Sequence, residues 1–199
     1  MKVVWAHNWF LDYRINVYRE LDRLLGGSLN LIYNKDNIPE RVDVKAREVL
    51  SSRAFPLVGE KTLTLGREKS SGDFANRIIK IRFQPGLFSK LKELNPDVVI
   101  GEGFFRWAIV NFVYAKLKSK PYVMLYERTA HTERSVSTFV LLLRRLLLRY
   151  IDVVCVNGTL SREYIQSLGF PRAYITEGHM VADVHTIRER MKNLDLKFV

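Results

Sequence analysis

Short apolar runs alternate along this chain with longer segments in which apolar side chains recur at helical spacing. Strands are predicted at 2–7, 28–34, 96–103, 121–126, 151–158 and 173–178. The segment 13–27 is typical of the helices, with leucine, isoleucine and tyrosine three or four positions apart and a Gly-Gly stop. Because the strand runs are apolar throughout rather than alternating, both of their faces should be buried, as in a parallel sheet covered by helices.

The middle of the chain follows this pattern less clearly. A helix is expected near 40–50, and strands at 61–65 and 77–83. Further helices are expected at 85–95, 104–120, 135–150 and 160–169. With about 30 residues in each β-α unit, six units fill this length. We therefore predict an α/β fold, namely a Rossmann-like, doubly wound and mainly parallel sheet flanked by helices.

Charged residues gather directly after the predicted strand that ends at Tyr126. In open parallel sheets ligands bind at the carboxyl ends of strands, so this cluster is the first candidate site. His131 is a candidate general base, and Glu127 or Glu133 could orient its imidazole. The alternative is a loop histidine that faces water or caps a helix.

Two arginines flank that histidine. Arg128 and Arg134 suit a phosphate or carboxylate, or they are surface charges near a helix N-terminus. A second candidate phosphate site is the turn formed by Asn157, Gly158 and Thr159. Helix capping by Thr159 or Ser161 is an alternative use of this turn.

Polar residues also follow two other predicted strands. The candidates for lining a pocket are His7, Asn8, Asp12, Tyr13, Arg14 and Glu102. Asp12 is alternatively a helix cap, and Glu102, which lies between two glycines, is alternatively a turn residue. His179, Asp183 and His185 match no standard ligand spacing, so no metal is expected. The chain also lacks a dinucleotide or P-loop glycine motif.

Composition adds information about partners and surroundings. The net charge is +11 and the pI about 9.8, which favours anionic partners such as phosphates or anionic lipid. Nucleic acid is not expected as a partner, because no aromatic and basic residues are interleaved in a known motif. The single cysteine implies no disulfide framework, so a cytoplasmic protein is expected.

The predicted helix at 135–150 has leucines in the middle of its basic face. On a helical wheel Leu141 and Leu148 fall among Arg144, Arg145 and Arg149. Exposed leucines among arginines predict a contact with an anionic membrane surface, in which case the protein would be peripheral on the cytoplasmic face. The alternative is that a second domain, another subunit or a neighbouring loop covers them.

Several segments in this order resemble the N-terminal domain of retaining glycosyltransferases of the GT-B fold, family 4. They are "YRINVYREL", "LKELNPDVVIGEG", "AKLKSKPYVMLYERTAHTERS" and "RYIDVVCVNGTLSREYIQSLGFPRAYITEGHMVADV". Such enzymes have two Rossmann-like domains, of which the N-terminal one mainly holds the acceptor. They transfer sugar from a nucleotide-sugar, usually without a divalent metal, and many act on lipid-linked acceptors.

The resemblance implies a division of the chain and roles for its residues. Residues 1–184 would be the acceptor-side domain. Residues 185–199 would be the linker and the start of a C-terminal donor-binding domain. That domain, in cis or in trans, would bind most of the nucleotide-sugar, with no separate cofactor. Glu127 or His131 would contact the acceptor hydroxyl or the transferred sugar. The alternatives are a binding module without catalysis, or one chain of a split enzyme. Alone, 1–199 is expected to be inactive.

Overall fold

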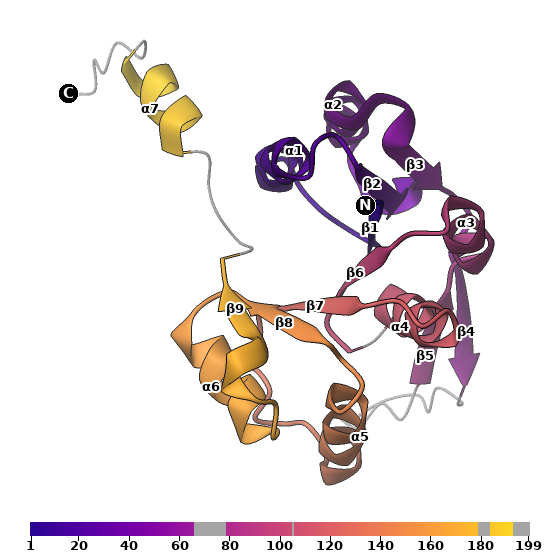
Figure 1. The fold of residues 1–199 in the computed structure, drawn as a ribbon, viewed down its shortest axis with the longest axis vertical. Coiled ribbons are helices and arrows are strands. Elements are labelled where there is room, and N and C mark those ends of the chain that lie inside the picture. The colour runs from indigo at the N-terminus through magenta and orange to yellow at the C-terminus, as the bar shows by residue number, and fades with distance from the viewer. Residues whose placement is uncertain (66–78, 105, 179–183, 193–199) are drawn as a thin grey trace, which may run out of the picture.

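A parallel sheet of seven strands runs through the part of the chain that the structure describes (Figure 1). This computed structural model describes residues 1–65, 79–104, 106–178 and 184–192. The strand order is β3-β2-β1-β6-β7-β8-β9. The strands are β1 (Val3–His7), β2 (Leu29–Asn34), β3 (Ala54–Leu57), β6 (Val98–Glu102), β7 (Tyr122–Tyr126), β8 (Val153–Val156) and β9 (Ile175–Glu177). The predicted Rossmann-like α/β fold is confirmed.

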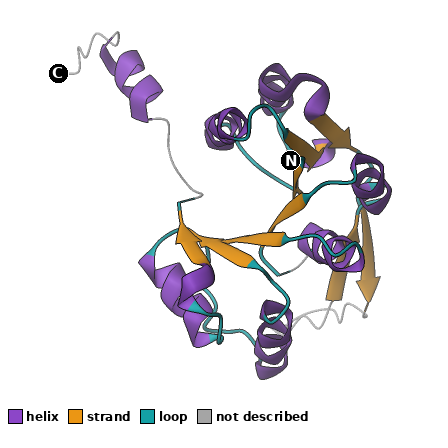
Figure 2. Cartoon of the chain, viewed as in Figure 1, coloured by secondary structure: helices purple, strands orange, loops and turns teal. Residues whose placement is uncertain are grey.

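Helices cover both faces of this sheet (Figure 2). They are α1 (Tyr13–Leu24), α2 (Glu40–Leu50), α3 (Leu87–Leu94), α4 (Trp107–Leu117), α5 (Thr138–Leu148) and α6 (Thr159–Ser167). A further helix, α7 (Val184–Lys192), stands away from the sheet (Figure 1). From β1 the chain adds strands in one direction through β3, and from β6 it adds them in the other. Since such crossovers are right-handed, α1 and α2 lie on one face and α4 to α6 on the other.

The strands are mainly apolar because both of their faces are buried. Every residue of β1 and of β2 is buried. One core cluster, which includes Tyr18 and Tyr33, lies on the side of α1 and α2. The other, which includes Leu91 and Tyr114, lies on the side of α3 and α4. Burial on both faces agrees with the sequence prediction.

Local signals in the sequence set the helix ends. Helix α1 ends at Leu24, and Gly26 and Gly27 follow with φ angles of +63° and +78°. Glycine adopts this left-handed conformation at little cost, so the predicted Gly-Gly stop is confirmed. Helix α5 begins after Ser137, whose hydroxyl accepts a hydrogen bond from the N–H of Val140 at 3.4 Å.

The fold differs from the prediction at the edge beyond β2. Strand β3 was not predicted; it contains Pro56, which an edge strand tolerates better than a central one. The strands expected at 61–65 and 77–83 do form, as β4 (Lys61–Leu65) and β5 (Ile79–Phe83). They pair with each other antiparallel in a separate two-stranded sheet.

Helix α5 buries a different face from the one predicted. Arg144 and Leu148 are buried, so the prediction that these two contact a membrane is wrong, whereas for Leu141, which is half-buried, it stays a prediction. Arg145 and Arg149 are exposed, as expected. The apolar side chains that do face outward are Phe139, Leu142, Leu146 and Tyr150. The reversal follows from Arg144, which turns inward to pair with the buried carboxylate of Glu133.

Two further findings bear on the organisation of the chain. Within the ranges described, no helix combines the length and the apolar character needed to cross a lipid bilayer. Helix α7 occupies part of the segment 185–199 that was expected to be an interdomain linker. The division of the chain at residue 184 stays a prediction.

Candidate functional site

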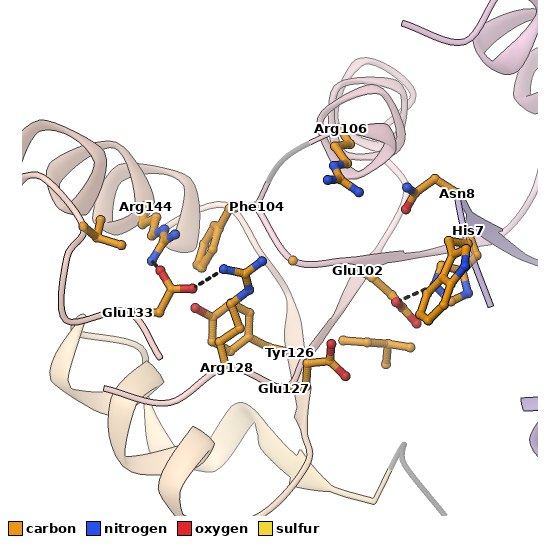
Figure 3. A pocket seen from close by; sticks show the side chains of 14 residues that line it. His7, Asn8, Glu102, Phe104, Arg106, Tyr126, Glu127, Arg128, Glu133 and Arg144 are labelled. Carbon is orange, nitrogen blue, oxygen red and sulfur yellow. Dashed lines mark hydrogen bonds and ion pairs between the residues drawn. The ribbon is translucent and has the colours of Figure 1, made fainter. Parts of the chain in front are cut away.

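An open cavity of about 500 Å³ lies at the carboxyl ends of β1, β6 and β7 (Figure 3). The crossover direction reverses between β1 and β6, and open α/β sheets bind ligands at such a switch point. Six of the residues singled out in the sequence line the cavity, namely His7, Asn8, Glu102, Glu127, Arg128 and Arg144. The structure thus brings together the ends of three predicted strands.

Glu102 forms one wall of the cavity together with His7. One carboxylate oxygen lies 2.6 Å from Nε2 of His7, and the other lies 3.2 Å from Nη2 of Arg14. Arg14 is 2% exposed, and burial by itself would lower its pKa. The negative charge of Glu102 reverses this effect and raises the pKa of Arg14 above its ordinary value. Glu102 is therefore held as a carboxylate beside a fixed positive charge.

His7 is oriented from its other side by Tyr18. The hydroxyl of Tyr18 lies 3.1 Å from Nδ1 of His7. Burial raises the pKa of Tyr18 well above its ordinary value, so the phenol keeps its proton. In the tautomer whose Nε2–H donates to Glu102, Nδ1 accepts the hydrogen bond from the hydroxyl of Tyr18. This chain of contacts fixes both the ring and the carboxylate.

Glu133 forms the opposite wall with two arginines. Its oxygens accept hydrogen bonds from Arg128 at 2.8 Å and from Arg144 at 2.6 Å. Arg144 also donates to the hydroxyl of Tyr164 at 2.9 Å, and its guanidinium lies 5.3 Å from the ring of Phe104. Burial alone would lower the pKa of Arg144, but pairing with Glu133 raises it, so the group stays charged. Of the two arginines, Arg128 is the one open to the cavity, since 64% of its side chain is exposed.

Glu127 lies between these walls and points toward the cavity (Figure 3). Its side chain makes no ion pair with any residue in the described ranges. Its backbone carbonyl accepts a hydrogen bond of 3.0 Å from the hydroxyl of Ser161 on α6. Glu127 is therefore an exposed residue with a fixed backbone, and its side chain pairs with no cation among the described residues.

His131 and Arg134 lie outside the lining of the cavity. His131 is exposed, and its Nε2 lies 3.2 Å from Nη1 of Arg134, which also donates to the carbonyl of His131 at 2.9 Å. Glu133 does not orient this histidine, because both of its oxygens bind arginines. The catalytic role of His131 and the phosphate-binding role of Arg134 stay predictions.

The candidates after the first strand divide into two groups. His7 and Asn8 line the cavity, whereas Asp12, Tyr13 and Arg14 do not. Asp12 pairs with Arg41 at 3.1 Å and with Lys45 at 2.6 Å, and its side chain makes no capping hydrogen bond. The hydrogen bond from Lys45 lowers the pKa of Asp12. Asp12 therefore joins α1 to α2 and does not face the site.

The predicted anion site at the start of α6 also lies beside the cavity rather than in its lining. Asn157, Gly158 and Thr159 are absent from the lining residues. The helix begins after Gly158 with no side-chain cap, and Ser161 uses its hydroxyl for Glu127 instead. Phosphate binding at this turn stays a prediction, whereas side-chain capping by Thr159 or Ser161 is not found.

Possible metal ligands are considered only among the residues that the structure describes. In the ranges the structure describes, no group of three or more histidine, cysteine or acidic residues is placed to hold a metal ion. His179 and Asp183 lie outside the described residues, as does the side chain of His185.

Sequence reasoning missed several lining residues, chiefly Trp9, Phe104, Arg106 and Tyr126. The sequence could have indicated Trp9, because this residue comes directly after Asn8 at the end of a predicted strand. Arg106 begins the helix after β6 and has a positive φ of +62°, which the sequence does not reveal. Glu133 was considered only as a partner of His131, because its contact with Arg144 spans eleven positions.

Comparison with known proteins clarifies the fold. No protein-family model matches this chain, and no curated protein matches it either. Among solved structures, Anabaena HepE in complex with UDP and glucose has a TM-score of 0.61 at 9% identity. That match covers 96% of this chain and 50% of HepE. The UDP-GlcNAc 2-epimerase of Methanocaldococcus jannaschii has a TM-score of 0.54 at 14% identity. That match covers 89% of this chain and 45% of the epimerase.

This chain has the fold of one half of a GT-B protein. It spans about half the length of these solved structures. Identities of this size show a shared fold and do not assign family 4, a retaining reaction or a substrate. What the site does must therefore be argued from its own residues.

Proposed function

We propose that this chain is the acceptor-side domain of a glycosyltransferase that transfers a sugar from a nucleotide-sugar to an acceptor with retention. The observation that carries the proposal is the cavity at the β1/β6 switch point, where carboxylates and arginines face one another. Two facts support it. The fold is half of a GT-B fold, and solved neighbours are described with UDP and sugar or named as UDP-sugar enzymes.

The charge of each lining residue indicates the role that we propose for it. Glu127, uncompensated and facing the cavity, contacts the acceptor hydroxyl and accepts its proton. Arg106 and Arg128 meet the phosphates of the donor. A second Rossmann-like domain, in cis or in trans, supplies most of the contacts to the nucleotide. His131 is the other candidate for the catalytic position.

Product analysis with the native protein, isolated from the cells that encode it, tests this function. The protein is incubated with radiolabelled UDP-glucose or UDP-GlcNAc and an extract of cellular glycans and lipids. We expect release of UDP and transfer of label to an acceptor through a linkage with the donor's anomeric configuration. A nucleotide-sugar changed only at C2 would instead indicate an epimerase. Binding without turnover would indicate a binding module.

We further propose that the outer face of α5 rests on an anionic membrane surface. This face presents Phe139, Leu142, Leu146 and Tyr150 beside Arg145 and Arg149. A groove between α4 and α5, lined by Ile109, Val113 and Leu147, extends the apolar area. Apolar side chains enter the interfacial region of a bilayer while the arginines meet lipid phosphate, so the charge of this face suits anionic lipid.

Vesicle sedimentation tests this contact. The native protein should sediment with vesicles that contain phosphatidylglycerol and much less with vesicles of phosphatidylcholine alone. Leu142→Ser should weaken binding, since it removes an apolar side chain that is 64% exposed on this face. Leu24→Ser is the matched control, because Leu24 is 66% exposed on α1. Equal sedimentation of both variants and wild type would count against the contact.

A further inference from the structure

The three tryptophans of this chain differ sharply in exposure. Trp5 is 2% exposed and Trp107 is 3% exposed, so both belong to the core. Trp9 is 46% exposed and lines the cavity at the end of β1. The residue after it, Phe10, is fully buried. The indole of Trp9 is thus open to the cavity although the next residue is buried, and it is available to a ligand.

The part of the cavity near Trp9 differs chemically from the arginine wall. The polar lining residues outside that wall are His7, Asn8, Glu102, Arg106 and Glu127. The charge of Glu102 is balanced by Arg14, whereas Glu127 has no ion-pair partner among the described residues. A phosphate or carboxylate placed beside Glu127 would meet the negative charge of its carboxylate. An uncharged, hydroxyl-rich group would instead donate hydrogen bonds to it.

We propose that Trp9 is the stacking platform for an uncharged sugar ring, so that the acceptor is a carbohydrate. One face of such a ring presents C–H bonds, which pack against the electron-rich face of the indole. The hydroxyls at its rim then reach the carboxylate of Glu127 and the side chain of Asn8. This inference rests on the proposed function, because it assumes that the cavity holds the acceptor.

The arrangement also orients the two substrates. Arg128 lines the cavity together with Glu133 and Arg144, and in Figure 3 Arg106 lies between this wall and Asn8. Donor phosphates are attracted to those arginines, and the acceptor ring occupies the opposite end. Glu127 lies between them, where it can take the proton of the hydroxyl that attacks the sugar carbon as the bond to the leaving phosphate breaks.

Tryptophan fluorescence provides the test, because Trp9 is the exposed tryptophan. Acrylamide quenching of the native protein is measured with a panel of neutral disaccharides and, separately, with inorganic phosphate. At least one disaccharide should protect the fluorescence from quenching in a saturable way, and phosphate should not. Calorimetry then gives the affinity of variants for that disaccharide.

The variants separate stacking from a general effect of substitution. Trp9→Ala should weaken disaccharide binding about tenfold, and Trp9→Phe should recover most of the loss, because an aromatic face is restored. Tyr174→Ala is the control, since Tyr174 is 57% exposed and lies outside the cavity lining. Circular dichroism checks that each variant is folded.

Three outcomes would overturn the inference. They are protection by phosphate alone, no saturable protection by any disaccharide, and equal affinities of Trp9→Ala and wild type. Each is distinguishable from failure of the proposed function. Label transfer to an acceptor that does not protect Trp9 would leave the glycosyltransferase in place and remove only the stacking platform.

Discussion

Glu133 is a buried carboxylate that holds two arginines from different parts of the chain. Its side chain is 1% exposed, and it binds Arg128 in its own loop and Arg144 on α5. A charge buried this deeply is stable only while its partners are in place. The pair Glu133–Arg144 thus positions the loop after β7 against α5 and shapes one wall of the cavity.

Glu133→Gln should therefore be strongly destabilising. It leaves Arg144 charged and 4% exposed with no carboxylate beside it, which costs about 3 kcal/mol of unfolding free energy. Urea unfolding followed by circular dichroism measures this loss. The control is Glu93→Gln, whose side chain is 62% exposed and pairs with Lys90 on the surface. Similar losses in both variants would show that the buried pair is not important for stability.

Individual side-chain contacts were the least predictable feature of the site. The sequence placed Glu127, His131 and Glu133 together after a strand, and the structure confirms that Glu127 and Glu133 reach the cavity. His131 instead contacts Arg134, three positions away. Which side chains of an irregular loop turn inward depends on partners distant in the chain, such as Arg144 and Tyr164, and local spacing carries no signal for them.

At the scale of elements, α5 shows where a helical wheel fails. Apolar residues occur on every side of this helix, so the wheel had no single apolar stripe to orient. The buried face is fixed by Arg144, an arginine that a wheel assigns to solvent. Helix α1 was predicted correctly because its buried face follows the apolar residues Ile15 and Tyr18, although Arg14 is buried beside them.

Strand β6 and helix α4 pack closely at Gly101. A Cβ on this residue would overlap the hydroxyl of Tyr122 and come within 3.2 Å of Nδ2 of Asn111. Gly101→Ala should therefore cost about 2 kcal/mol of unfolding free energy through overpacking. Adding Tyr122→Phe removes the overlapping hydroxyl, so the double variant should lose less than the sum of the single variants. Strict additivity in thermal or urea unfolding would refute this packing argument.

The contact between Asp22 of α1 and Arg53 makes stability depend on pH. Arg53 donates to the carboxylate at 2.9 Å, and this interaction lowers the pKa of Asp22. The folded pKa is then below the unfolded value of about 3.9, so the contribution is complete above that value. It is lost as pH falls through the lower, folded pKa. The N–H of Leu29 also donates to Asp22, at 3.0 Å.

Asp22→Asn should thus cost about 1.5 kcal/mol of unfolding free energy at neutral pH. The difference from wild type should narrow as the solution is made more acid than about pH 4. Urea unfolding at several pH values measures this. Glu163→Gln is the control, because Glu163 is exposed and has no ion pair among the described residues. A difference for Asp22→Asn that stays constant with pH would contradict the assignment.

At the scale of the whole molecule, the order of strands and helices was largely predictable. Buried parallel strands must be apolar on both faces, and this signal is strong for β1, β2 and β7. Strands β4 and β5 were predicted as strands, whereas the edge strand β3 was missed, because an edge strand lacks that continuous pattern. The location of the site followed from topology, since polar residues at strand ends gather at the switch point.

The central claim is that this cavity is where sugar is transferred, with Glu127 acting on the acceptor hydroxyl. The most direct test is the turnover of Glu127→Gln and His131→Ala in the native protein, using the acceptor found by product analysis. We expect Glu127→Gln to lower kcat at least about 100-fold and to leave thermal unfolding unchanged. A comparable loss in His131→Ala alone would move the catalytic role to that histidine. Wild-type turnover in both variants would contradict the proposal that sugar is transferred in this cavity.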